Sequence, residues 1–95
     1  MDILDPLLLV PVIALDDYEI DRRVVARLSA LFCRENQLIP VSSSGTHLIV
    51  AMVDPCDEAL LGELALRTGC EIDPVRTTAD DVARAIRRVY GDPLS

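Results

Sequence analysis

The sequence predicts an α+β domain in which a small mixed three-stranded sheet packs against three helices, with an apolar arm in front. Three observations lead to this prediction. Two β-prone runs, at residues 38–41 and 46–53, flank a polar loop that ends at Gly45, which is the pattern of a β-hairpin. A third β-prone run follows at residues 71–76. Apolar residues at helical spacing fill the segments before the hairpin, between the second and third runs, and after the third.

The chain begins with the apolar arm. Residues 7–15 are almost all apolar, and Pro11 interrupts them, so a strand here should lie at a sheet edge or begin near Val12. The run has about half the roughly 20 residues of a membrane helix, and it lacks the basic start of a signal peptide. We expect one cytoplasmic domain over residues 1–95 that does not insert into the membrane. Its parts are an arm and lead-in (1–20), an αββαβα core (21–91) and a tail (92–95).

The first helix is expected to run from Asp21 to Asn36. Asp21 is an N-cap residue type, since its carboxylate accepts from the free N–H groups of a first turn, and Asn36 is a suitable stop. Between them apolar residues recur at steps of three and four. This spacing predicts one amphipathic helix whose buried stripe is Val24, Val25, Leu28, Leu31 and Phe32.

The hairpin supplies the first two strands, which are therefore antiparallel. Pro40 places the first strand at a sheet edge, because proline cannot donate to a ladder. The second run is apolar nearly throughout, as expected of a central strand that is covered on both faces.

The second helix joins the second strand to the third. Either Asp54 caps it, with Pro55 at the first helical position, or Asp57 caps it one turn later. Gly69 ends it by supplying a left-handed conformation. The strand–helix–strand crossover predicts that the flanking strands are parallel. Pro74 places the third strand at the periphery.

The third helix is expected between Thr78 and Gly91. Thr78 followed by Asp81 resembles a capping box, with aspartate in place of glutamate. The expected buried stripe is Val82, Ala85, Ile86, Val89 and Tyr90.

Charge limits the classes of partner. Nine arginines, no lysine and 16 acids give a formal net charge of −7. This balance argues against nucleic acid and against an anionic membrane surface, because both attract Lys and Arg. A basic or neutral protein partner remains open. The four glycines cannot form a P-loop and its lysine is missing, which argues against nucleotide hydrolysis by this chain.

No catalytic, metal or cofactor site is predicted. The carboxylate pairs at residues 16–17, 57–58 and 80–81 each precede a helix, where carboxylates stabilise the N-terminal dipole. His47 lies beside the hairpin turn and is expected to face solvent. Three widely spaced cysteines predict reduced, mostly buried thiols. An enzyme that uses Cys56 or the carboxylate pairs is a remaining alternative, although four nearby acids oppose activation of that thiol.

Several segments, taken in order, resemble a known family. They are Leu38 to Val41, the strand-to-helix junction Leu48 to Pro55, and the terminal run Ala85 to Gly91. The lead-in from Val10 to Asp21 also fits. Together they resemble the N-terminal domain of type II secretion and type IV pilus assembly ATPases, the GspE-like secretion proteins.

The resemblance implies a non-catalytic adaptor that couples a motor or signalling protein to the cytoplasmic part of an inner-membrane assembly protein. In some members of the family, cyclic di-GMP binds paired motifs of the type R-L-G-x-x-L-V-x-x-G. The nearest match here runs from Arg27 to Asn36, with Ser29 and Asn36 in place of the glycines. Cyclic di-GMP sensing through Arg27 is the alternative function. The other interpretation of this stretch is simply the first amphipathic helix.

The apolar arm is where we expect a protein partner. Its apolar residues exceed what a small sheet needs. They either pack onto or add a strand to another domain, or cover the open face of their own sheet. The other domain would belong to the inner-membrane assembly protein or to the parent chain of this domain. The candidate partner contacts are Leu7, Leu8, Leu9, Val10, Val12 and Ile13.

Overall fold

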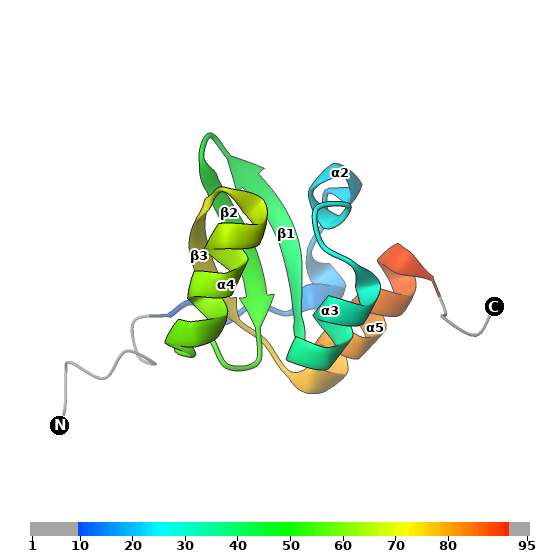
Figure 1. The fold of residues 1–95 in the computed structure, drawn as a ribbon. Coiled ribbons are helices and arrows are strands. Elements are labelled where there is room, and N and C mark those ends of the chain that lie inside the picture. The colour runs from blue at the N-terminus through cyan, green and yellow to red at the C-terminus, as the bar shows by residue number, and fades with distance from the viewer. Residues whose placement is uncertain (1–9, 92–95) are drawn as a thin grey trace, which may run out of the picture.

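A computed structural model of the chain describes residues 10–91 and shows one mixed sheet surrounded by helices (Figure 1). The strand order is β1-β2-β3, with β1 antiparallel and β3 parallel to β2. The predicted α+β class, hairpin and parallel crossover are therefore confirmed. In chain order the elements are η1 (Leu15–Asp17), α2 (Arg22–Val25), α3 (Ala30–Asn36), β1 (Leu38–Ser44), β2 (His47–Met52), α4 (Glu58–Thr68), β3 (Glu71–Arg76) and α5 (Ala79–Tyr90).

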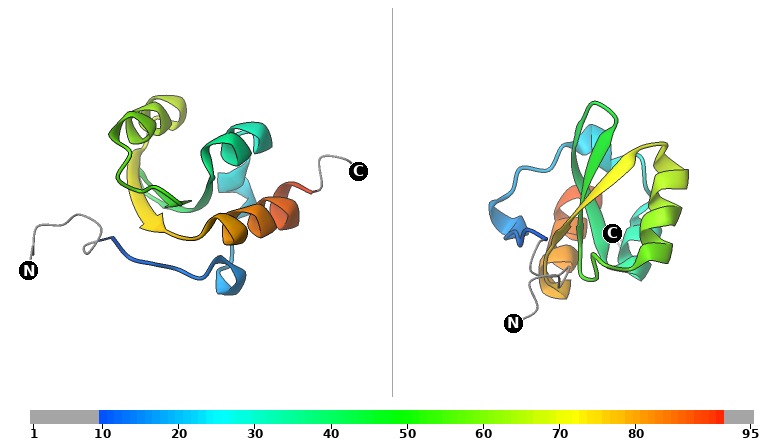
Figure 2. Two further views of the ribbon diagram at one scale, coloured as in Figure 1. Left: turned by 90° about the horizontal axis from the view of Figure 1, so that it is seen from below. Right: turned by 90° about the vertical axis from the view of Figure 1, so that its left-hand side faces the viewer.

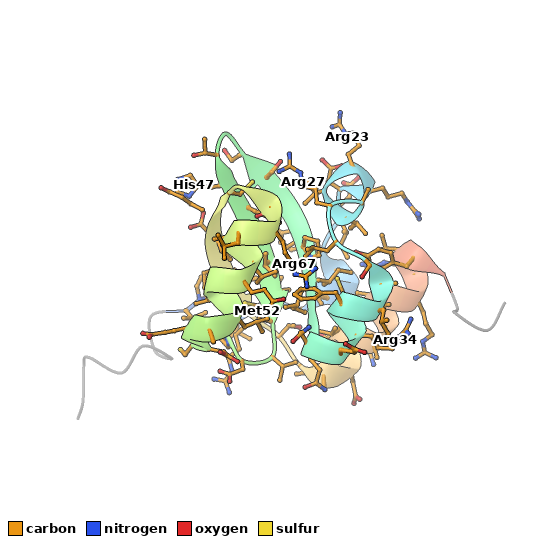
Figure 3. The ribbon with its side chains drawn as sticks, in the orientation of Figure 1. Arg23, Arg27, Arg34, His47, Met52 and Arg67 are labelled. Carbon is orange, nitrogen blue, oxygen red and sulfur yellow. The ribbon has the colours of Figure 1, made fainter. Side chains whose placement is uncertain are left out.

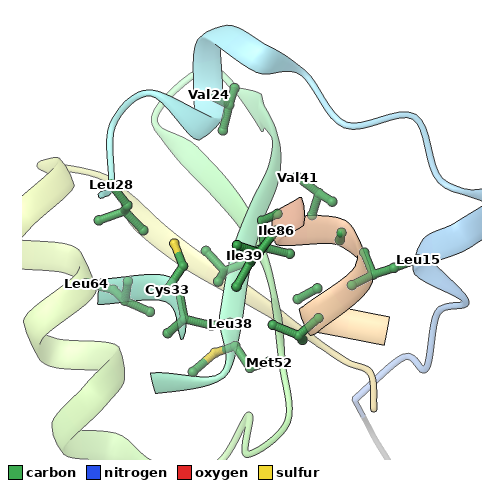
Figure 4. Packing of buried hydrophobic residues seen from close by; sticks show 14 of the residues in the cluster. Leu15, Val24, Leu28, Cys33, Leu38, Ile39, Val41, Met52, Leu64 and Ile86 are labelled. Carbon is green, nitrogen blue, oxygen red and sulfur yellow. The ribbon is translucent and has the colours of Figure 1, made fainter. Parts of the chain in front are cut away.

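The sheet lies between two helical layers. α3 and α4 cover one face, while α5 and η1 lie on the other side (Figure 2). The central strand β2 is covered on both faces, which explains its continuous apolar sequence. The core between the layers is shown in Figure 4 and includes the completely buried side chains of Leu15, Cys33, Leu38, Ile39, Val41, Leu48, Val50, Met52 and Leu64.

The prediction of a single helix over residues 21–36 is wrong, so residues 10–91 contain four α-helices and a 3-10 turn in place of the three helices expected. Asp21 caps α2 as predicted, but this helix ends at Val25. Ser29 then starts a second helix, because its hydroxyl accepts from the Phe32 N–H at 3.1 Å. The break resets the helical phase. Leu31, expected on the buried stripe, is consequently 59% exposed.

The two strand prolines occupy positions that a sheet tolerates. Pro40 lies in the edge strand β1, next to a bulge between Pro40 and Ser42. At the start of β3 the Glu71 N–H donates to the Thr46 carbonyl, and directly after β3 the Thr77 N–H donates to the Met52 carbonyl, so both point to the β2 side. N–H groups alternate in direction along a strand, so an ordinary residue at position 74 would point its N–H to the outer edge of β3. Proline has no N–H, and at this position it therefore loses no hydrogen bond to β2. Both edge predictions are confirmed.

The remaining helix ends follow the sequence closely. Asp57, rather than Asp54, caps α4, with its carboxylate accepting from the Leu60 N–H at 3.1 Å. Gly69 ends α4 with φ +68°, which favours glycine. Thr78 caps α5 by accepting from the Asp81 N–H at 3.1 Å. Within residues 10–91 no helix combines the length and the apolar character that crossing a membrane requires.

Candidate functional site

The six arm residues chosen as partner contacts do not share one environment. Leu7, Leu8 and Leu9 lie outside the described residues. Val10 is half-buried, and Ile13 packs against the core. Val12 is 70% exposed.

The backbone of the arm is held at one point beside β3. The Ile13 N–H donates to the Arg76 carbonyl at 2.9 Å, and the Arg76 N–H donates to the Pro11 carbonyl at 2.7 Å. These bonds place Val12 opposite Arg76 in a single parallel bridge, consistent with a strand that begins near Val12. At the described end of the arm, Ile13 covers its own domain and Val12 faces solvent, so both interpretations of the arm stay predictions.

Arg27, the candidate nucleotide contact, lies in the break between α2 and α3 and not within a helix. Its Nη1 donates to the Cys70 Sγ at 3.0 Å. No carboxylate within residues 10–91 lies at ion-pair distance from its guanidinium. Figure 3 shows Arg23 and Arg27 at the end of the molecule that carries the hairpin turn, whereas Arg34 lies lower on α3.

A pocket of about 330 Å³ lies beside Arg27. Arg23 and Arg27 enter it from the α2 segment, and Ser43 enters it from the end of β1. The remaining lining residues are Asp21 and Val24. The Asp21 carboxylate is engaged as the α2 cap, and its pKa lies below the usual value chiefly because it accepts from the Arg23 N–H. The Arg23 Nε also lies 3.5 Å from the Asp21 carboxylate. The pocket therefore offers the Arg27 guanidinium and the Ser43 hydroxyl as donors suited to an anionic oxygen.

The two glycine positions that this segment lacks have ordinary local roles. Ser29 has φ −76° and caps α3, so no left-handed conformation is needed there. Asn36 is the last residue of α3, and the left-handed residue is Gln37, with φ 53°. With Ser29 and Asn36 at the two glycine positions of the motif, α3 thus has a regular start and a regular end.

Tyr90 is a residue that the sequence interpretation placed only on the buried stripe of its helix. Its hydroxyl reaches from α5 to the α2–α3 break, where it lies 2.8 Å from the Val25 carbonyl oxygen and 2.9 Å from that of Leu28. The Cys33 Sγ lies 3.4 Å away. Burial and the contact with Cys33 raise the pKa of Tyr90 well above its usual value, which keeps the hydroxyl protonated as a donor.

His47 is exposed as predicted, but it has partners. Its Nε2 lies 2.9 Å from a Glu71 carboxylate oxygen, and its Nδ1 lies 2.9 Å from one of Asp73. The alternation Glu71-x-Asp73, in register with His47, is the sequence signal for this cluster. Because the two carboxylates sit at opposite ring nitrogens, they do not share one metal position with the imidazole. Throughout residues 10–91, no three such side chains converge on a metal position.

Three of the carboxylates considered as catalytic candidates make structural contacts. Asp57 caps α4, while Asp16 and Asp81 both bind Arg84. All three cysteines are free. Cys33 is buried, but Cys56 and Cys70 are partly exposed, so the expectation of mostly buried thiols holds for Cys33 alone.

Comparison with known proteins decides the family. The MshEN domain matches residues 8–95, which is nearly the whole chain. The chain belongs to the MshEN domain family. The predicted resemblance to the N-terminal domains of secretion and pilus ATPases is thereby confirmed.

Individual relatives agree with this family. The MshEN domain described here is 29% identical over 83 residues to the type IV pilus assembly ATPase PilB of Myxococcus xanthus (strain DK1622), covering 87% of this chain and 15% of PilB. A structure of MshE with cdg matches with a TM-score of 0.79 and 25% identity, over 87% of this chain and 60% of that one. The N-terminal domain of XpsE shares the fold, with a TM-score of 0.77 and 21% identity over 90% of this chain and 60% of that one. This MshEN domain thus spans a small part of PilB and about three-fifths of the solved chains.

Proposed function

We propose that this MshEN domain is a non-catalytic docking and regulatory domain. It couples a secretion or pilus motor, or a signalling protein, to the cytoplasmic part of an inner-membrane assembly protein. In this proposal the protein is cytoplasmic and reaches the inner membrane only through its partner. The division into an arm (1–20), a core (21–91) and a tail (92–95) stays a prediction.

The observation that carries the docking proposal is the position of Val12. Its backbone is fixed to β3 by the bridge to Arg76, while its side chain is 70% exposed. β3 is the last strand of the described sheet, and the arm occupies its outer edge at Arg76, which holds the Val12 side chain at the rim of the sheet. An apolar side chain held at such an edge suits an apolar partner surface, and the net charge of −7 favours a basic rim around it.

A binding measurement with the purified cytoplasmic part of the assembly protein tests this function. We expect Val12→Asp to weaken binding at least tenfold, because it places a charge in the contact. Leu66→Asp is the matched control, since Leu66 is 88% exposed on α4, away from the arm. Equal binding by both variants and the wild type, or no binding by the wild type, would reject the proposal.

A second candidate function is cyclic di-GMP sensing at Arg27. The observation that favours it is the pocket of about 330 Å³, in which the Arg27 guanidinium faces no carboxylate of the described residues at ion-pair distance. MshE, solved with cdg, has the same fold as this chain. An arginine that pairs with no carboxylate of residues 10–91 is suited to a phosphate oxygen.

Calorimetric titration with cyclic di-GMP tests this second function. The wild type should bind, and Arg27→Ala should abolish binding. Arg34→Ala is the matched control, because Arg34 belongs to the same sequence segment but lies on α3 outside the pocket. A flat thermogram for the wild type, or an equal loss for both variants, would dismiss a site at Arg27.

A further inference from the structure

The break between α2 and α3 leaves two carbonyl groups without their usual helical donors. In a continuous helix the Leu28 carbonyl would accept from the Phe32 N–H, which here donates to Ser29 Oγ instead. The Val25 carbonyl would accept from the N–H of residue 29, and here it accepts from the Leu28 N–H at 3.2 Å. The Leu28 carbonyl is therefore left without a backbone donor from residues 10–91, and it needs another donor where water is excluded.

The Tyr90 hydroxyl is that donor. It lies within 2.9 Å of both carbonyl oxygens, so its single proton is shared between the last residue of α2 and the residue before Ser29. Arg27 lies between these two anchor points. A second contact joins the same elements, because Arg22 Nη1 donates to the Val89 carbonyl at 3.3 Å. The end of α5 therefore contacts both sides of the α2–α3 break, the segment that contains Arg27.

We propose that Tyr90 is a positioning residue for Arg27. Its hydroxyl fixes the α2–α3 break in the conformation that presents the Arg27 guanidinium to the pocket, although Tyr90 itself touches no ligand. The ligand half of this inference rests on the second candidate function above. The backbone half, that Tyr90 holds the break, is independent of any ligand.

Tyr90→Phe tests both halves, because it removes the hydroxyl and keeps the ring. Tyr18→Phe is the matched control. Tyr18 is partly buried, and within residues 10–91 its hydroxyl makes no hydrogen bond. The backbone half is measured by amide exchange at Arg27 and Leu28, whose N–H groups donate to the Val24 and Val25 carbonyls inside the break. The reference amide outside the break is that of Val82 in α5, which donates to the Thr78 carbonyl.

We expect Tyr90→Phe to speed exchange at Arg27 and Leu28 about tenfold more than at Val82, since the break loses a donor worth about one ordinary hydrogen bond. Tyr18→Phe should leave this ratio unchanged. Equal acceleration at all three amides, or none, would overturn the inference whatever the ligand does. Faster exchange at the break combined with no nucleotide binding by the wild type would reject the sensing function and keep the backbone half.

The ligand half is measured by cyclic di-GMP titration. Tyr90→Phe should weaken binding about fivefold, and Tyr18→Phe should not. If Tyr90 acts through Arg27, its substitution should add nothing in an Arg27→Lys background that still binds weakly. If Tyr90→Phe lowered the affinity for cyclic di-GMP by the same factor in the Arg27→Lys background, Tyr90 would act on stability alone. That result would reject its positioning role.

Discussion

Arg84 on α5 binds the Asp16 carboxylate in η1 through two nitrogens of its guanidinium, although the two residues lie 68 positions apart. Nε donates to Oδ1 at 3.3 Å, and Nη2 donates to Oδ2 at 3.1 Å. One turn further along α5, Arg88 donates to the Leu15 and Tyr18 carbonyls at 3.2 and 3.3 Å. Two arginines of one helix thus fasten the lead-in onto the domain, directly after the arm that carries Val12.

The Arg84–Asp16 pair predicts a small, salt-dependent effect on stability. Asp16→Asn should lower Tm by a few degrees at most, because both side chains are about half exposed and solvent screens their attraction. The difference from wild type should shrink in 1 M salt. Asp17→Asn is the control, since Asp17 is exposed and adjacent in the same turn. If Tm fell equally in both variants, the change in net charge and not the loss of the Arg84–Asp16 pair would be responsible.

Two leucines of α4 predict opposite outcomes of the same substitution. Leu64 is completely buried between α4 and the sheet, so Leu64→Ala should cost about 2–5 kcal/mol through lost burial and the cavity left behind. Leu66 is 88% exposed, and Leu66→Ala should change stability by no more than about 0.5 kcal/mol. Urea unfolding measures both. Similar losses at the two positions would mean that the outer face of α4 is covered in solution.

Two glycines of the same region also predict opposite signs. Gly62 lies within α4 with open space around the position of a Cβ, so Gly62→Ala should raise stability by about 0.5–1 kcal/mol. Gly69 has φ +68° at the end of the helix, and Gly69→Ala should cost about 1 kcal/mol or more. Thermal unfolding of the two variants checks the prediction. A gain at Gly69 would contradict the left-handed cap.

Stability is predicted to fall in alkaline solution because of Cys33 and Tyr90. Burial raises the pKa of Cys33 above its usual 9.0 and that of Tyr90 above its usual 10.0. Above about pH 9 the unfolded chain loses protons that the folded chain keeps, so the free energy of unfolding decreases as pH rises. Their stabilising contribution is complete below the unfolded pKa values.

Urea unfolding between pH 7 and 11 measures this slope. Tyr90→Phe should flatten the upper part of the curve, because phenylalanine does not ionise. A slope that persists unchanged in Tyr90→Phe would assign the alkaline loss to other groups.

Local signals explain why so much of the fold was predictable. Pro40 and Pro74 identified the edge strands, since a missing N–H is tolerated only where no partner strand accepts it. Gly69 and Thr78 marked helix ends through backbone and side-chain chemistry that acts within a few residues. The arm was recognisable by composition, but its bridge to Arg76 depends on where β3 ends in space.

The break at residues 26–29 shows where local reasoning failed. Val24, Val25, Leu28 and Phe32 fit one helical stripe, and each is buried as predicted. A continuous helix was nevertheless wrong, because Ser29 supplies a competing cap and Tyr90 supplies a donor from 62 positions away. The contact from Tyr90 is the one that supplies a donor to the buried carbonyls of the break. It comes from a distant part of the chain, so no local sequence pattern reveals it.

The sequence by itself determined the class of the domain, its hairpin and parallel crossover, and the classes of partner that its charge disfavours. Periodicity, turn residues and net charge are properties of short segments or of the whole composition, so they can be determined from the sequence without a structure. Tertiary structure alone decided that Arg27 stands in a break beside a pocket, that Tyr90 holds this break, and that Val12 faces solvent while Ile13 does not. These features depend on which distant groups meet, and they are fixed only when the sheet and its two helical layers pack together.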